Sequence, residues 1–339
     1  MIANEEQLED FLAEPSQADV RAMAEMEGDL LILGVAGKMG PSLAKRARRA
    51  CERAKLPKRI IGVARFSDAR VQQELQAVGI ETVSADLLAP GVMATLPDAP
   101  NVLYMAARKF GSTGAEHLTW AMNTLLPALV ADRYAASRIV AFSTGNVYPL
   151  VPVTQGGASE NTPTGPVGEY AQSALGRERI FEYFSQRNQT PVMFLRLNYA
   201  IDLRYGALLD IGQRVFERRP VDVSMGHVNV IWQGDANSIA LRSFALCQSP
   251  PAVLNVTGPE TVPVRWIARR FGERFGVEPK VEGTESETAL LSNAARCHRL
   301  FGYPSVTVEQ MIEWVAEWIG MGGATLSKPT HFETRDGRF

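Results

Sequence analysis

Three glycines, Gly34, Gly37 and Gly40, stand three residues apart directly after an apolar segment that begins at Asp29. Glycine at the first position allows a tight exit from a strand, and glycine at the second lets the backbone approach a diphosphate. The third lets a helix pack close to the sheet, and the amide groups at the start of that helix favour anions. A plain tight turn would use the same residue type. The position between a strand and a helix favours a dinucleotide-binding loop.

The end of the next expected strand bears on which dinucleotide this loop would hold. A carboxylate at that position usually binds the ribose 2′-hydroxyl of NAD, but here the strand 59–64 is followed by Arg65. A guanidinium favours the 2′-phosphate of NADP and can also stack on adenine. An ordinary solvated arginine at a strand end is the simpler explanation. We expect NADP, while Asp68 keeps NAD open.

Apolar strands and amphipathic helices alternate along the chain as far as about residue 200. Continuously apolar strands are typical of a parallel sheet that is covered on both faces. We therefore predict an α/β fold, a Rossmann-type doubly wound parallel sheet whose strands all end at one edge. The expected strands are 29–35, 59–64, a short one that reaches 83, 101–105, 138–143 and 191–197, and the expected helices are 41–53, 69–78, 116–136 and 168–187.

The chain divides into four expected segments. Residues 1–28 read as a helical prefix, and residues 29–200 as the dinucleotide-binding Rossmann domain. Short helices, turns and prolines follow over 201–320, which indicates a smaller α/β lobe that binds substrate. Residues 321–339 read as a C-terminal tail that is flexible or held only by a partner.

Composition excludes several classes of protein. The 339 residues carry a net charge of −2, which gives no basic field for nucleic acid or an anionic membrane. The sequence contains no apolar run of about 18 residues, the length that a helix needs to span a bilayer. The acidic N-terminus lacks the design of a signal peptide, and three cysteines far apart suit a reducing compartment, so we expect a cytoplasmic protein. The four histidines show no zinc-like spacing, so no metal site is expected.

Further residues follow the expected strands in a fixed order. Asp86-Leu87 follows the third strand, Ala106-Ala107 the fourth and Thr144 the fifth, Tyr170 opens the next helix, and Asn198-Tyr199 follows the sixth strand. With the glycine loop, this series resembles the extended short-chain dehydrogenase/reductases, specifically the NAD-dependent epimerase/dehydratase family that acts largely on nucleotide sugars. The resemblance covers about residues 29–320 and is good through 200.

The resemblance implies a role for each of these positions. Lys109 would face the substrate, Thr144 would hydrogen-bond the reacting oxygen, and Tyr170 would be the acid/base. A homodimer would form through the helices around 116–136 and 168–187. The remaining positions would bind the cofactor or border the substrate: Gly34, Gly37, Lys38 and Met39 along the diphosphate, Asp86 and Leu87 at the adenine, Ala106 and Ala107 at the ribose and nicotinamide, and Asn198 and Tyr199 between nicotinamide and substrate.

One departure from the family lies beside the expected acid/base. The family has a lysine four residues after the tyrosine, whereas this chain has Ala174. An ammonium there would lower the tyrosine pKa from its ordinary value of about 10. We expect another cation to serve, with Lys109 favoured over Arg177, and the positive ring of an oxidised cofactor would help. Alternatively, the substrate has an acidic proton or an activated carbonyl, so that Tyr170 need not ionise.

The family resemblance implies an enzyme, an NAD(P)-dependent oxidoreductase or epimerase. Its partner would be a small molecule, a sugar or a sugar-derived alcohol or ketone, and the reaction would be hydride transfer. Arg204 follows the sixth strand, and we expect it to hold a carboxylate or phosphate of the substrate. The alternative is a dinucleotide-binding regulatory or scaffold protein without turnover.

Overall fold

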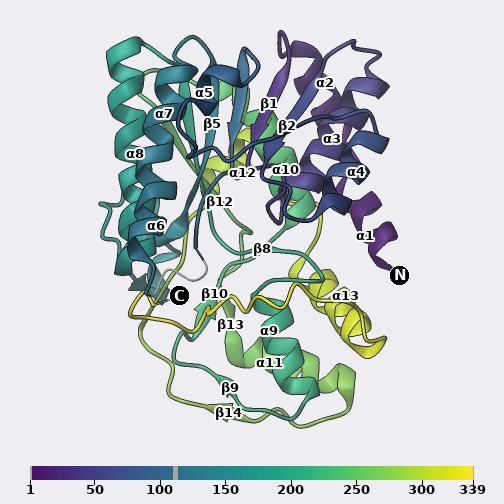
Figure 1. Ribbon diagram of the computed structural model, residues 1–339. Helices are drawn as coiled ribbons and strands as arrows, with labels where there is room; N and C mark the ends of the chain where they lie inside the picture. Colours follow the sequence, from purple (N-terminus) through teal and green to yellow (C-terminus); the bar gives the residue numbers. More distant parts are fainter. Residues whose placement is uncertain (1, 110–113, 339) are drawn as a thin grey trace.

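A seven-stranded sheet forms the centre of the protein, and all of its strand pairs are parallel. The computed structural model describes residues 2–109 and 114–338 (Figure 1). The strand order β12-β7-β5-β4-β1-β2-β3 confirms the predicted doubly wound α/β fold. The strands are β1 (Leu30–Leu33), β2 (Ile60–Ala64), β3 (Glu81–Ser84), β4 (Asn101–Tyr104), β5 (Arg138–Thr144), β7 (Val192–Leu197) and β12 (Ala252–Val256).

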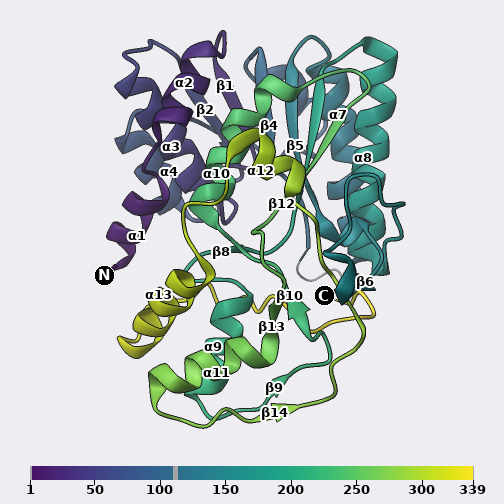
Figure 2. The same cartoon turned by 180° about the vertical axis from the view of Figure 1, so that it is seen from behind.

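Helices cover both faces of this sheet, as Figures 1 and 2 show. Successive side chains of β1 point to opposite faces, so Leu30 and Ile32 enter one apolar core while Leu31 and Leu33 enter the other. The first core is covered by α2 (Gln17–Glu25), α3 (Gly40–Arg53), α4 (Ala69–Ala77), α10 (Gln233–Arg242) and α12 (Ala295–Phe301). The second is covered by α5 (Val92–Thr95), α7 (Leu126–Arg133) and α8 (Gly168–Asn188).

The seventh strand comes from beyond residue 200, where we expected the Rossmann domain to end. Strand β12 pairs with β7 from Ala252 opposite Met193 to Val256 opposite Leu197. Helices α10 and α12 pack on the same sheet. The sequence from 201 onward therefore contributes to the central sheet as well as to the smaller lobe.

The smaller lobe has an apolar core of its own, built from three helices and paired two-residue strands. The N-terminal helix α1 (Glu5–Leu12) packs Leu8 and Leu12 into this core, and Phe332 of the C-terminal segment joins it. The remaining elements are α9 (Ala207–Phe216), α11 (Val264–Phe275) and α13 (Val308–Gly320), the strand pairs β8 (Ala200–Ile201) with β11 (Ile231–Trp232), β9 (Val221–Asp222) with β14 (Val281–Glu282), β10 (His227–Val228) with β13 (Val262–Pro263) and β6 (Val151–Pro152) with β15 (Thr288–Ala289), and the 3₁₀ turns Gly145–Val147, Val153–Gln155 and Ser243–Leu246.

The long helix expected over 116–136 is interrupted. It begins as α6 (Glu116–Trp120), widens into a π-helical turn (Ala121–Leu125) and continues as α7. The π-helical turn contains the fully buried Asn123. Such turns are frequent at functional sites, and this one brings an amide side chain against α8. Among the described residues, no helix is both long and apolar enough to cross a bilayer.

Candidate functional site

The glycine loop joins β1 to α3 and has the tight path that the sequence predicts. Gly34 has a φ of +90°, and a Cβ there would lie 2.7 Å from the backbone nitrogen of Ala106. A Cβ on Gly40 would lie 2.0 Å from the carbonyl oxygen of Val35, so only glycine lets the helix start this close to the strand. Gly37 is exposed, and a Cβ there would have only the Gly34 carbonyl within 4 Å. A side chain at Gly37 would therefore fill the space beside the loop.

A cavity of about 510 Å³ opens beside this loop, at the carboxyl ends of β1, β4, β5 and β7. Ligands of open α/β sheets bind at this edge. Ten of the predicted residues line the cavity together, from segments far apart in the sequence. They are Gly34, Gly37, Lys38, Met39, Ala107, Lys109, Thr144, Tyr170, Asn198 and Tyr199.

Other predicted cofactor residues lie outside this cavity. Leu87 and Ala106 are buried in the core, where each has 6% of its surface exposed. Arg65 and Asp86 are exposed just beyond the ends of the neighbouring strands β2 and β3. Gly40 has no side chain and so lets α3 pack close to the end of β1. Arg65 and Asp86 thus mark a second, exposed stretch of the same sheet edge, where an adenine half could lie.

The expectation for Arg204 needs correction. Its guanidinium does not line the cavity but lies 2.6 Å from a carboxylate oxygen of Asp202 and 2.6 Å from one of Glu9. These charged hydrogen bonds tie α1 to the loop that follows β8. The only feature of the sequence that pointed to Arg204 was its position after a strand. The sequence alone does not show that two carboxylates form ion pairs with its guanidinium.

Tyr170 and Thr144 meet inside the cavity. Tyr170 lies in the first turn of α8 with 8% of its surface exposed, and its side chain hydrogen-bonds that of Thr144. Burial raises the pKa of Tyr170 above its ordinary value, while the charge of Arg177 and the hydrogen bond to Thr144 lower it. The Lys109 ammonium lies 5.7 Å from the centroid of the Tyr170 ring. The phenol therefore sits near two cations despite the missing lysine.

Arg177 is held rigidly on the same helix as Tyr170. It donates hydrogen bonds to the carbonyl oxygen of Phe142 and to the side-chain oxygen of Asn123, both at 2.8 Å. The amide nitrogen of Asn123 in turn donates to the hydroxyl of Ser173 and to the carbonyl oxygen of Arg108. None of these partners carries a negative charge that would offset the effect of the Arg177 guanidinium on Tyr170.

Ala174 occupies the place of the family's lysine but faces an apolar cluster rather than the cavity. It has no exposed surface and packs with Val147, Tyr148, Met225 and other buried side chains. Ala174 is not one of the described residues that line the cavity. Ala174 therefore contributes to packing, and the cations that line the cavity are other residues.

The cavity is rich in cations. The ammonium of Lys38 lies 3.0 Å from the centroid of the Tyr205 ring. Burial lowers the pKa of Lys38 to about 6, and repulsion from Lys109 and Lys328 adds to this effect. Burial also lowers the pKa of Lys109 to about 8, against the attraction of Asp210. An anion placed among these groups would be stabilised, and it would raise their pKa values again.

Several residues of the cavity were not predicted from the sequence. Tyr205, Gln233 and three residues of the C-terminal segment, Leu326, Lys328 and Thr330, also line it. Tyr205 follows Arg204 directly, so it is the neighbouring side chain, and not that of Arg204, that lines the cavity. The C-terminal residues have no motif that could have identified them.

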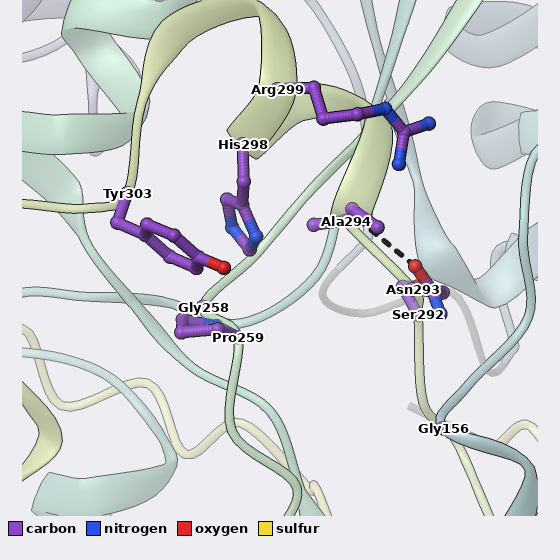
Figure 3. A pocket seen from close by; sticks show the side chains of 10 residues that line it. Gly156, Gly258, Pro259, Ser292, Asn293, Ala294, His298, Arg299 and Tyr303 are labelled. Atoms are coloured by element: carbon purple, nitrogen blue, oxygen red, sulfur yellow. Dashed lines mark hydrogen bonds between the residues drawn. The ribbon is translucent and has the colours of Figure 1, made fainter.

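A second cavity of about 320 Å³ lies between α12 and the loop that follows β12 (Figure 3). The rings of His298 and Tyr303 face each other there, with centroids 5.0 Å apart. The side-chain oxygen of Asn293 accepts a hydrogen bond from the backbone of Ala295. This cavity shares no lining residue with the larger one, so it is separate from the site beside the glycine loop.

Comparisons with known proteins agree with this fold. Residues 30–201, slightly more than half of the chain, match the NAD dependent epimerase/dehydratase family, and the chain belongs to that family. No curated protein matches the sequence at a significant level.

Solved structures with this fold are distant in sequence. UDP-glucuronic acid 4-epimerase from Bacillus cereus, in complex with UDP-glucuronic acid and NAD, superposes with a TM-score of 0.70 at 16% identity, over 86% of this chain and 99% of that chain. UDP-glucose 4-epimerase from Thermus thermophilus, in complex with NAD, gives 0.70 at 18% identity, over 88% and 100%. MoeE5 in complex with UDP-glucose and NAD gives 0.69 at 18% identity, over 87% and 99%.

Proposed function

We propose that the protein is an NAD(P)-dependent oxidoreductase or epimerase that acts on a sugar or a sugar-derived alcohol or ketone. The observation that carries this proposal is the meeting of the glycine loop and the hydrogen-bonded Tyr170 and Thr144 in one cavity. A nicotinamide dinucleotide, when bound, takes up and returns a hydride. The exposed Gly37 and the adjoining cavity leave room for its diphosphate.

The chain's own residues supply the proton chemistry in this proposal. Tyr170 gives a proton to the substrate oxygen, or takes one from it, and Thr144 holds that oxygen in place. Arg177 and Lys109 stabilise the phenolate form, in the role of the missing lysine. Asn198 and Tyr199 border the substrate. Tyr199 has a φ of +44°, a strained backbone for a tyrosine, and such strain is common at binding sites.

Two of the compared structures hold UDP-glucose or UDP-glucuronic acid beside NAD, which supports a nucleotide sugar as the substrate class. We propose a nucleotide sugar as the first substrate to test. The protein would be incubated with each oxidised coenzyme and a panel of nucleotide sugars, and the products analysed for a changed stereocentre or a reduced coenzyme. Epimerisation would return the coenzyme to its starting state, whereas net oxidation would leave it reduced.

A second candidate is a dinucleotide-binding regulatory or scaffold protein without turnover. The observation that favours it is the raised pKa of Tyr170, since burial outweighs the two groups that lower it. The same panel distinguishes the two functions. Tight coenzyme binding with no change in any substrate would favour the scaffold.

Coenzyme choice gives a first prediction. We propose that Arg65 binds the 2′-phosphate of NADP, because its side chain is exposed just beyond β2 and Asp68 is already paired with Arg70 at 2.8 Å. Arg65→Ala should weaken NADP binding by roughly tenfold or more, since a charged hydrogen bond is lost, and should leave NAD nearly unchanged. Calorimetric titration with both coenzymes measures this. Arg70→Ala is the control, and an equal loss for both coenzymes in Arg65→Ala would refute the assignment.

We also propose a homodimer formed through α6, α7 and α8. Large apolar side chains stay exposed on these helices and on the π-helical turn between α6 and α7, including Leu118 at 43%, Leu125 at 54% and Tyr183 at 58%. A second copy of the chain would cover them. Sedimentation equilibrium of the purified chain tests this, and a monomer at every concentration would contradict the proposal.

A further inference from the structure

A groove of about 260 Å³ lies at the edge of the sheet where the strands begin, opposite to the cavity beside the glycine loop. It is lined by Arg138, the first residue of β5, whose neighbouring strands both run parallel to it. The other walls come from α2, from the C-terminal end of α10 with the 3₁₀ turn that follows it, and from the C-terminal end of α12. Figures 1 and 2 show α2 at the end of the molecule away from the smaller lobe. The two sites share no lining residue.

Three arginines reach this groove from three different elements. Arg21 comes from the middle of α2, Arg138 from the start of β5 and Arg242 from the end of α10. Within residues 2–109 and 114–338, none of these three guanidiniums forms an ion pair with a carboxylate. Glu25 is the one acidic side chain among the described lining residues, and it is exposed. The groove therefore carries an excess of positive charge.

Arg242 is fixed on the wall of the groove. Its guanidinium carbon lies 4.7 Å from the centroid of the Phe301 ring, and one of its nitrogens donates a hydrogen bond to the carbonyl oxygen of Phe301 at 3.2 Å. Burial lowers the pKa of Arg242 below its ordinary value, and repulsion from Arg21 and Arg46 adds to this effect, against the attraction of Asp19. Asp19 is itself paired with Arg46 at 2.7 Å. A guanidinium has five N–H donors, so the bond to Phe301 leaves donors for a ligand.

Apolar side chains form much of the remaining wall. Phe244 is buried and Phe301 is half-buried, while Leu300 exposes 46% of its surface. Such a wall favours an organic group over a free ion, because the group leaves water when it covers apolar surface. The volume lies just below the range of roughly 300–1,000 Å³ that is usual for drug-sized ligands, which indicates a small molecule.

We propose that this groove binds a small organic phosphate, with its phosphate held by Arg21, Arg138 and Arg242 and its organic part lying on Phe244 and Leu300. A phosphate ester has three terminal oxygens that accept hydrogen bonds, whereas a carboxylate has two, so three guanidiniums from three directions match the phosphate better. The inference goes beyond the proposed function, because the groove lies away from the glycine loop and does not depend on coenzyme binding.

Calorimetric titration at low ionic strength with phenyl phosphate and with inorganic phosphate tests this proposal. Phenyl phosphate presents a phosphate group and adds an apolar ring. We expect it to bind saturably, and roughly fivefold or more tightly than inorganic phosphate, because the ring leaves water on the apolar wall. Equal affinity for the two probes, or no saturable binding of phenyl phosphate, would overturn the proposal.

Two arginine variants locate the bound phosphate. Arg21→Ala removes an exposed side chain, so it should not disturb folding and should weaken phenyl phosphate binding about threefold. Arg242→Gln keeps a donor for the carbonyl oxygen of Phe301 but removes the charge, and it should weaken binding roughly tenfold or more. Arg269→Ala, at an exposed position on α11 in the smaller lobe, is the matched control and should bind as the unchanged protein does.

Gly37→Leu distinguishes the groove from the cavity beside the glycine loop, because Gly37 lines only that cavity. Binding that falls in Arg21→Ala and Arg242→Gln but not in Gly37→Leu would support the groove, whether or not the protein binds a coenzyme. Binding that falls in Gly37→Leu and is unchanged in both arginine variants would place the phosphate at the glycine loop and overturn the proposal. Equal affinity in all of these variants would overturn it as well.

Discussion

Tyr170→Phe should lower the rate of the chemical step by about 10²–10⁴-fold, the usual contribution of a positioned acid/base. The change deletes the hydroxyl that bonds Thr144 and keeps the ring, which is almost fully buried. Coenzyme affinity should change little, because the glycine loop lies on other elements. Single-turnover kinetics with the first active substrate, beside calorimetric titration of the coenzyme, would measure the two effects separately.

A matched control for this change is Tyr104→Phe. Tyr104 is also buried, and its hydroxyl donates to the carbonyl oxygen of Met122 at 3.3 Å, but it does not line the cavity. Its removal should leave the rate nearly unchanged. A Tyr170→Phe protein that turns over as fast as the control would show that the reacting proton comes from another group.

Ala174→Lys, which restores the family pattern, should destabilise the protein and not activate it. The side chain would enter a cluster with no exposed surface at this position, so it would bury an amine without a partner and overpack its neighbours. We expect the free energy of unfolding to fall by roughly 3 kcal/mol or more. Denaturant titration measures this loss, and turnover of the folded fraction should not rise.

The control for the added charge is Gln172→Lys on the exposed side of the same helix. It should stay within about 0.5 kcal/mol of the unchanged protein, as most surface substitutions do. A stable Ala174→Lys protein with a large gain in rate would mean that the lysine reaches Tyr170 and that the chain is an enzyme that has lost its activating group. Arg177 and Lys109 would then have no part in the role that we propose for them.

The sheet could be predicted from the sequence because most of its first six strands are short apolar runs that alternate with helices, with the polar β3 as the exception. The alternation fixes parallel pairing, and parallel pairing brings the strand ends to one edge. The edge explains why Gly34, Thr144 and Tyr170 line one cavity although they lie far apart in the chain. Strand β12 was not predicted, because a five-residue apolar run after residue 200 has no periodicity that distinguishes a strand from a turn.

The parts of the site that were not predicted depend on tertiary contacts. Nothing local distinguishes an arginine that binds substrate from Arg204, whose partners Asp202 and Glu9 include one 195 residues away. The C-terminal segment is equally hidden, since no local motif indicates that Thr330 lines the cavity and bonds Asp210 and Lys109. The π-helical turn at Asn123 also lacks a sequence signal, although it supports Arg177 and so affects the charge beside Tyr170.

Calorimetric titration of the ligand-free chain with NAD⁺ and NADP⁺ tests the central claim most directly, that the loop from Gly34 to Gly40 holds a nicotinamide dinucleotide next to Tyr170. We predict saturable binding of one coenzyme per chain. We also predict loss of this binding in Gly37→Leu, whose side chain would fill the space beside the loop. Absence of heat with both coenzymes, or undiminished binding in Gly37→Leu, would contradict the account.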